Sequence, residues 1–156
     1  MLVEAIRGAV GTGTLLLDLY CGTGALGIAL SNQFTQVIGV ELHEPAVRCA
    51  RENASRNGLS ASYLCGPVEK LVQTLELPES YTVLVDPPRA GLHKDALGFL
   101  ARLPARKLVY VACKASSLLR DGQFLLQNGW KLSHWEAVDM FPQTSHVEVV
   151  ACFERP

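Results

Sequence analysis

Short apolar runs that suit β-strands alternate along this chain with segments of helical pattern, and no other feature limits its fold as strongly. Strands that alternate with helices form a parallel sheet with helices on both faces, and strands that are apolar throughout are buried on both sides. The last two runs follow one another without a full helix between them, which predicts an antiparallel hairpin at one edge. We therefore expect an α/β fold with strands at 15–20, 36–41, 61–65, 81–86, 107–113, 131–138 and 146–153, and helices at 22–30, 45–57, 68–75, 93–103 and 116–127.

The length and charge of the chain limit its partners. Its 156 residues are close to the size of one domain and can bury a full core without disulfides or a metal. Charged residues make up 19% of the chain, a low share that argues against disorder. The net charge of −1 excludes a strongly basic nucleic-acid arm. Contact with a nucleic acid would therefore need a local site or a further region.

Neither a membrane nor a metal ion is expected as a partner. No apolar run approaches the roughly 18 residues of a transmembrane helix, and the start of the chain lacks the pattern of a secretory signal. The five cysteines are odd in number and form no CxxC pair, so we expect neither a disulfide framework nor a zinc site. This cysteine usage indicates an intracellular, reducing compartment, with the cytosol or nucleus favoured over the mitochondrion.

A glycine-rich loop follows the first predicted strand and opens the first predicted helix. Residues 22–27 read Gly-Thr-Gly-Ala-Leu-Gly, a spacing that lets the backbone approach a ligand closely. Glu41 ends the next strand, where an acidic side chain can bind ribose hydroxyls. Alone, these two features also fit a nicotinamide dinucleotide site, a tight turn without a ligand, or a carboxylate that only faces solvent.

The surroundings of the glycine loop favour one of these interpretations. Residues 18–24, Asp-Leu-Tyr-Cys-Gly-Thr-Gly, resemble the first motif of S-adenosylmethionine-dependent methyltransferases. The Asp-Pro-Pro-Arg segment at 86–89 lies where many such enzymes have an acidic or amide residue beside the methyl group. The resemblance implies a Rossmann-like fold, with a mostly parallel sheet and an antiparallel closing strand. It also implies S-adenosyl-L-methionine as the cofactor, bound by Tyr20, Gly22, Gly24, Glu41 and Asp86.

Three segments narrow the resemblance to one family. They are 86–91 (Asp-Pro-Pro-Arg-Ala-Gly), 110–113 (Tyr-Val-Ala-Cys) and 139–148 (Asp-Met-Phe-Pro-Gln-Thr-Ser-His-Val-Glu). In this order and spacing they resemble the RNA (uracil-5-)-methyltransferases, with the eukaryotic transfer-RNA members closest in appearance. The resemblance implies methylation of uridine C5 in RNA, with tRNA favoured over rRNA as the substrate. It assigns the nucleophile to Cys113 and the base to Glu148.

We interpret residues 1–156 as a single catalytic domain, because the family's amino-terminal RNA-binding region is absent from this sequence. Two alternatives stay open. A nicotinamide-dependent oxidoreductase would explain the glycine loop and Glu41 but would leave Cys113 and Glu148 without a role. A non-catalytic RNA-binding domain gains support from Lys114-Ala115, because the family usually has Asn-Pro after its nucleophile. Cys113 would then be a small packed residue, and Glu148 an outward-facing carboxylate on an edge strand.

Overall fold

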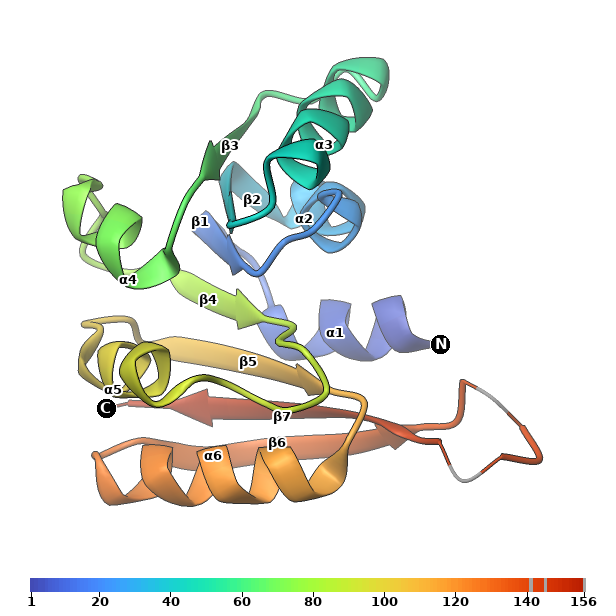
Figure 1. The fold of residues 1–156 in the computed structure, drawn as a ribbon, viewed down its shortest axis with the longest axis vertical. Coiled ribbons are helices and arrows are strands. Elements are labelled where there is room, and N and C mark those ends of the chain that lie inside the picture. Colours follow the sequence, from blue (N-terminus) through green and yellow to red (C-terminus); the bar gives the residue numbers. More distant parts are fainter. Residues whose placement is uncertain (141, 145, 156) are drawn as a thin grey trace.

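The strands of the structure join in one sheet. The computed structural model describes every residue except 141, 145 and 156. Within the described residues, seven strands lie in the order β3-β2-β1-β4-β5-β7-β6 (Figure 1). The first five are parallel, and β7 is antiparallel to both β5 and β6, which confirms the predicted sheet and its closing hairpin. The strands are β1 Gly13–Leu19, β2 Phe34–Glu41, β3 Ala61–Cys65, β4 Thr82–Val85, β5 Lys107–Ala112, β6 Lys131–Val138 and β7 Glu148–Glu154.

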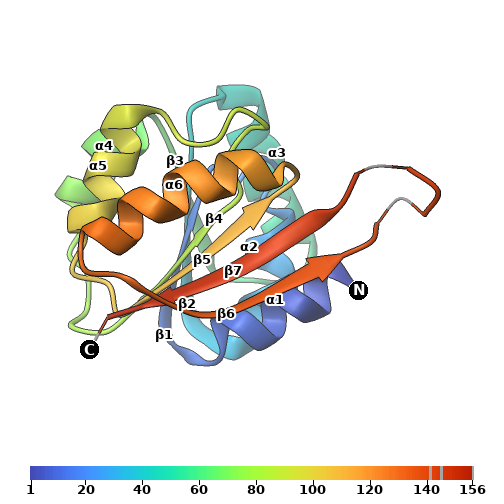
Figure 2. The same ribbon diagram turned by 90° about the horizontal axis from the view of Figure 1, so that it is seen from below.

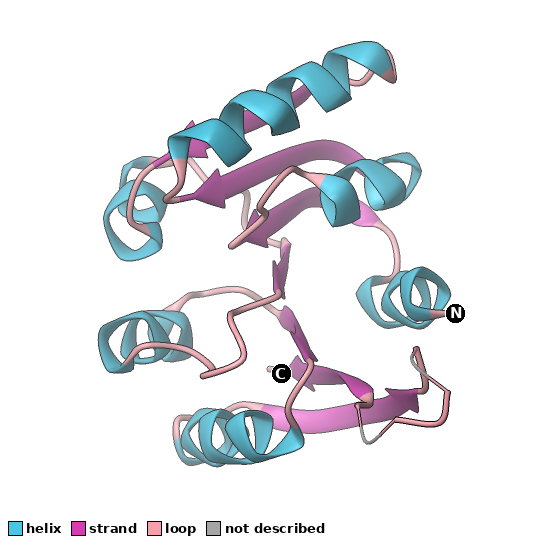
Figure 3. Ribbon diagram, turned by 45° about the vertical axis from the view of Figure 1, so that its right-hand side comes forward, coloured by secondary structure: helices cyan, strands magenta, loops and turns pink. Residues whose placement is uncertain are grey.

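Helices cover both faces of the sheet (Figure 3). Short 3-10 turns extend two of them, at Ser31–Gln33 and Val72–Thr74. Among the described residues, no helix has both the length and the apolar character needed to cross a membrane. One face carries α1 Leu2–Val10, α2 Ala25–Leu30 and α3 Glu44–Arg56, and the other carries α4 Val68–Leu71, α5 Lys94–Arg102 and α6 Ala115–Gln127.

The central strand β1 shows how the sheet divides the core. Leu15, Leu17 and Leu19 belong to the cluster under α4, α5 and α6, whereas Leu16 belongs to the cluster under α1 and α2. This division follows from the two-residue period of a strand. Burial of each such leucine contributes roughly 1.5–3 kcal/mol to the stability of the fold, so β1 holds the start of the loop that follows it in a fixed position. Asp18 shares the side of Leu16, and its carboxylate therefore lies beneath α2.

The helix α1 is an element that our sequence-based assignment misses, since that assignment begins at residue 15. The helix buries Ile6, Ala9 and Val10, whose spacing is that of one helix face. It packs against β5, β6 and β7 and ends at Gly11, whose φ of 69° favours glycine. The helical period is present in the sequence, but it extends over only 9 residues.

The closing hairpin brings the end of the chain beside β5. Figure 2 shows α6 running along β7 and β6. The outer strand β6 is exposed along its length except at Val138, as expected of an edge strand. Val138 pairs with Glu148, and Val149 pairs with Ala112 of β5. The segment 139–148, one of the three that carry the family resemblance, connects β6 to the start of β7; its residues Phe141 and Ser145 lie outside the described residues.

Candidate active site

The predicted site residues meet at one edge of the sheet. Tyr20 follows β1, Glu41 ends β2, Asp86 follows β4 and Cys113 follows β5, while Glu148 begins the antiparallel β7 at the same edge. The strand order reverses between β1 and β4, and in open α/β sheets ligands bind beyond the carboxyl ends of the strands at such a point. The fold therefore gathers, at a ligand-binding position, side chains that are scattered along the sequence.

The glycine loop has an unusual backbone from its first residue. Tyr20 has a φ of 62°, so the predicted strand ends one residue earlier, at Leu19. Gly22 has a φ of 52° and Gly24 a φ of 79°, values that favour glycine. A Cβ on Gly22 would meet no atom within 4 Å, whereas one on Gly24 would lie 2.7 Å from the Tyr63 hydroxyl oxygen. Gly22 thus leaves open space over the loop, and Gly24 allows close packing on Tyr63.

Glu41 holds the glycine loop against the end of β2. Its Oε2 accepts a hydrogen bond from the Gly22 N–H at 3.1 Å, and its Oε1 accepts one from the His43 N–H at 2.9 Å. An ionised carboxylate offers about four acceptor positions, so two further donors can still bind. The structure therefore places Glu41 beside the loop, half-buried, with capacity for a ligand.

A cavity of about 280 Å³ lies beside Tyr20, close to the lower end of the range for small-molecule sites. Burial raises the pKa of Tyr20 to about 12, with a further contribution from the charges of Glu69 and Glu41. Of the residues that line this cavity, the sequence motifs singled out Tyr20 alone, because the others come from segments after several different strands. The cavity is lined by Tyr20, Leu42, Gly66, Pro67, Val68, Glu69, His93, Asp95 and Ala96.

Asp18 is a further ionisable residue beside the glycine loop, and the sequence motif alone suggested no role for it. Its side chain is 1% exposed, and its Oδ2 accepts a hydrogen bond from the Gly27 N–H at 3.0 Å. The other oxygen, Oδ1, is buried without a protein partner. Burial raises the pKa of Asp18 to about 7; the bond from Gly27 opposes this shift and the charge of Asp86 adds to it. A charged residue inside the apolar run 15–19 was the available signal.

Asp86 and Glu148 lie close enough to influence each other's charge. Desolvation by the surrounding protein raises the pKa of Asp86 to about 6, and the negative charge of Glu148 contributes. Water still reaches Asp86, which is exposed, and solvent screening therefore weakens the interaction between the two charges. The structure thus brings a predicted cofactor ligand and the predicted base to one place.

Cys113 and Glu148 are neighbours through the pairing of β5 with β7. Ala112 pairs with Val149, so the next residues outward along the two strands are Cys113 and Glu148. Cys113 is a free, half-buried cysteine, and α6 begins two residues after it, at Ala115. Glu148 is also half-buried. Their roles as nucleophile and base stay predictions, while their shared position is a feature of the fold.

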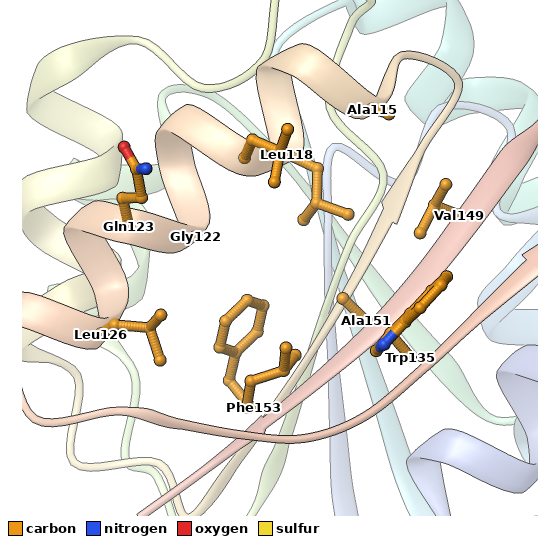
Figure 4. Close-up of a pocket in the computed structure, with 11 residues that line it drawn as sticks. Ala115, Leu118, Gly122, Gln123, Leu126, Trp135, Val149, Ala151 and Phe153 are labelled. Carbon is orange, nitrogen blue, oxygen red and sulfur yellow. The ribbon is translucent and has the colours of Figure 1, made fainter.

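An apolar pocket of about 320 Å³ lies between α6 and the hairpin and reaches the site only at one end (Figure 4). Ala115 and Val149 form that end, and Leu118, Leu126 and Phe153 line the remainder. Gln123 and the indole of Trp135 are its only polar side chains among the described residues. Ligand sites need several placed polar groups, and we therefore do not assign this pocket to the chemistry.

Comparison with known proteins defines the class and then the family. A family model described as a methyltransferase domain matches residues 16–86, which include β1, the glycine loop and Glu41. The strand order and this match define the chain as a Rossmann-like methyltransferase domain. A second model, described as tRNA (Uracil-5-)-methyltransferase, matches residues 69–155, more than half of the chain. The chain belongs to this family, which favours a methyltransferase over a nicotinamide-dependent oxidoreductase.

Relatives agree with this membership. An uncharacterized RNA methyltransferase of Chlorobaculum tepidum is 39% identical over 95% of this chain and 32% of its own length. The 23S rRNA (uracil(1939)-C(5))-methyltransferase RlmD of Marinomonas posidonica is 39% identical over 90% of this chain and 32% of its own length. The structure of Pyrococcus abyssi tRNA (uracil-54, C5)-methyltransferase with S-adenosyl-L-homocysteine superposes with a TM-score of 0.84, at 34% identity over 97% of this chain and 37% of that one. The chain therefore spans about a third of the length of these relatives.

Proposed function

We propose that this chain is the catalytic part of an S-adenosylmethionine-dependent enzyme that methylates uridine at C5 in RNA. The observation that carries the proposal is the meeting of Cys113 and Glu148 at the carboxyl edge, beside Asp86. A nucleophile, a base and an adjoining cofactor site are the parts that this reaction needs. Membership of the family supports the same assignment.

The residues at the glycine loop fit S-adenosyl-L-methionine, which supplies an electrophilic methyl group when bound. Glu41 would accept hydrogen bonds from the ribose hydroxyls, while the open space over Gly22 would let the cofactor lie on the backbone. The cavity lined by Tyr20 and Leu42 suits the adenine ring, because it combines an aromatic with an aliphatic wall. Asp86 lies towards Glu148 and would face the amino-acid part of the cofactor.

The chemistry follows from the weakness of uracil C5 as a nucleophile. The Cys113 thiolate adds to C6, and the electrons of the C5–C6 double bond move onto the ring as an enolate. C5 of the enolate would then be the nucleophile for the methyl group that S-adenosyl-L-methionine, held by Glu41 and the glycine loop, would supply, with S-adenosylhomocysteine as the leaving group. Glu148 takes the proton from C5, the double bond re-forms, and the C6–S bond breaks to return the thiolate.

The RNA substrate would have to present its uridine out of the base stack, because C5 and C6 are otherwise covered. We favour tRNA, with rRNA as the alternative, since relatives of both kinds are similar to this chain. The net charge of −1 supports a grip on RNA that lies largely outside these 156 residues. All five cysteines are free, which supports an intracellular, reducing compartment.

Product analysis tests the proposal. The full-length protein is incubated with S-adenosyl-L-methionine and unmodified tRNA or rRNA, and the digested RNA is analysed for 5-methyluridine. We expect 5-methyluridine with the full-length protein and little from the 156 residues alone, although these should bind S-adenosylhomocysteine. Methylation of another base, or of uridine at a position other than C5, would contradict the proposal. Binding of NADH in place of S-adenosylhomocysteine would contradict the cofactor.

A further inference from the structure

The helix α6 holds the loop between β4 and α5 through a hydrogen-bonded network, which we call the loop clamp. The clamp consists of Tyr110 of β5 and of Ser117, Arg120 and Asp121 of α6. It binds the backbone of the loop segment 89–92, three residues after Asp86. The network therefore connects the loop that begins with Asp86 to the helix that begins beside Cys113.

Asp121 is the centre of the clamp and is 0% exposed. Its Oδ2 accepts hydrogen bonds from the Tyr110 hydroxyl at 2.7 Å and from the Leu92 N–H at 2.8 Å. Its Oδ1 accepts one from Arg120 Nε at 2.7 Å. A buried carboxylate is tolerated when its charge and both oxygens have partners, as they do here. Burial and the neighbouring Asp121 raise the pKa of Tyr110, so its hydroxyl stays a donor.

Arg120 extends the clamp to the loop carbonyls. Its Nη2 donates to the carbonyl oxygens of Ala90 at 3.1 Å and Leu92 at 3.3 Å. Ser117 Oγ lies 2.8 Å from the carbonyl oxygen of Lys114 and 3.3 Å from that of Arg89, so its single proton can be donated to the loop or to its own helix. The Arg120 side chain is 57% exposed, and an exposed ion pair alone would contribute little. Its fixed contacts with both a buried carboxylate and the loop distinguish it from an ordinary surface arginine.

The loop itself is shaped to fit the clamp. Gly91 has a φ of +82°, and a Cβ at this position would lie 2.5 Å from Arg120 Nη2 and 2.7 Å from Asp121 Oδ2. The Gly91 N–H donates to the carbonyl oxygen of Pro88 at 2.7 Å, which closes a tight turn. Only glycine meets both conditions without displacement of the clamp. The loop between β4 and α5 therefore packs closely against α6 because residue 91 has no side chain.

We infer that Arg120 and Asp121 are positioning residues for methyl transfer: they hold the loop 86–92, with Asp86 and Arg89, in place relative to Cys113. This inference rests on the proposed function. Asp86 is also fixed by β4 before it and by two prolines after it, so loss of the clamp should displace Arg89 more than Asp86. Arg89 lies against the first turn of α6, which begins two residues after Cys113, so its displacement should affect methyl transfer more than cofactor binding.

Two variants and a matched control test the inference in the full-length protein. Arg120→Ala removes the contacts with the loop carbonyls, and Tyr110→Phe removes one hydrogen bond to Asp121 while the ring stays. Arg155→Ala is the control, because Arg155 also donates to three backbone carbonyls, those of Leu103, Ala101 and Asn128, at the opposite edge of the sheet. Amide hydrogen exchange over 86–93, the dissociation constant of S-adenosylhomocysteine and the single-turnover rate of methyl transfer are measured for each.

For Arg120→Ala we expect faster exchange over 86–93, a cofactor dissociation constant within about threefold of wild type and a methyl-transfer rate lower by about tenfold to a hundredfold, the scale of a small misplacement. Tyr110→Phe should show the same pattern to a smaller extent, and Arg155→Ala should lower the melting temperature without changing the rate. Unchanged exchange, or faster exchange with an unchanged rate, overturns the inference. A wild-type protein without uridine methylation overturns the proposed function instead, and the inference with it.

Discussion

The site at the carboxyl edge of the sheet has a cofactor half, around the glycine loop, and a chemical half, around Cys113 and Glu148. These two halves are built in different ways. The cofactor half depends mainly on the glycine loop and its nearest strands, to which Asp86 and the α5 wall of the cavity beside Tyr20 are added. Gly27 donates to Asp18, 9 residues before it, and Gly22 donates to Glu41, 19 residues after it. The chemical half joins β4, β5, α6 and β7, and Leu92 reaches Asp121 across 29 residues. The first half is thus fixed mainly by backbone geometry, and the second by tertiary packing.

This difference implies that the halves can fail separately. Glycine positions and backbone hydrogen bonds shape the cofactor half, so changes at Cys113 or Glu148 should leave it intact. The chemical half needs the antiparallel register of β7 and the loop clamp, which many residues support.

Cys113→Ala should abolish methyl transfer, with a loss of at least about a thousandfold, because no enolate can form without the nucleophile. The dissociation constant of S-adenosylhomocysteine should stay within about twofold, since Cys113 follows β5 and the cofactor half is formed elsewhere. Calorimetry and a single-turnover assay measure the two values. Cys49→Ala, at an exposed cysteine of α3, is the control that should change neither. Residual methylation above a hundredth of the wild-type rate would place the nucleophile elsewhere.

Asp18→Asn should change how stability depends on pH. The folded-state pKa of Asp18, about 7, lies above its ordinary value of 3.8, so its stabilising contribution is complete below pH 3.8 and is lost as the pH rises through 7. The variant does not titrate at this position. Relative to the variant, the wild type should therefore lose on the order of 3 kcal/mol of unfolding free energy between pH 4 and pH 8.

Urea unfolding at several pH values measures this difference for Asp18→Asn. Glu79→Gln, a change at an exposed carboxyl group, is the control that should follow the wild type closely. Parallel curves for wild type and Asp18→Asn would show that the carboxyl group of Asp18 titrates normally. Burial of Asp18 beneath α2 would then not raise the pKa of its carboxyl group.

Two glycines compare the halves directly. Gly22→Ala should lower stability by only about 1 kcal/mol, the cost of its left-handed backbone, but should weaken cofactor binding because the methyl group enters open space over the loop. Gly91→Ala should lower stability by about 2–3 kcal/mol, since strain and a clash with the clamp add together, and should leave cofactor binding nearly unchanged. Gly8→Ala, in the helix α1 with no atom nearby, should be slightly stabilising. Unchanged cofactor affinity in Gly22→Ala, together with weakened affinity in Gly91→Ala, would contradict the assignment of the glycine loop to the cofactor and of the loop 86–92 to the chemistry.

Glu41→Gln should weaken S-adenosylhomocysteine binding by about 1–2 kcal/mol, the scale of a lost charge-assisted hydrogen bond. The amide keeps the size of the side chain and one acceptor, so the bond from the Gly22 N–H can persist. Calorimetry measures the affinity, and Glu52→Gln on the exposed face of α3 serves as the control. An unchanged affinity would remove Glu41 from the cofactor site.

The sequence predicted the strands and the hairpin because each is a local pattern of apolar residues. The shared edge of Tyr20, Glu41, Asp86 and Cys113 follows from the parallel strands, because the carboxyl ends of such strands lie together. The loop clamp could not be predicted, because the contact of Asp121 with Leu92 depends on how α6 lies over the loop. For the same reason, the proximity of Asp86 to Glu148 and the contact of Tyr63 with Gly24 appear only in three dimensions.

In the proposed mechanism, Cys113 forms a covalent bond to uridine and Glu148 acts only afterwards, when the C5 proton must leave. The full-length Glu148→Gln variant is incubated with RNA and S-adenosyl-L-methionine and examined by denaturing gel electrophoresis and mass spectrometry. We predict a protein–RNA adduct that carries the added methyl group, accumulates because no base removes the proton, and is absent when Cys113→Ala is combined with Glu148→Gln. Normal turnover by Glu148→Gln, or an adduct that persists without Cys113, would contradict the account.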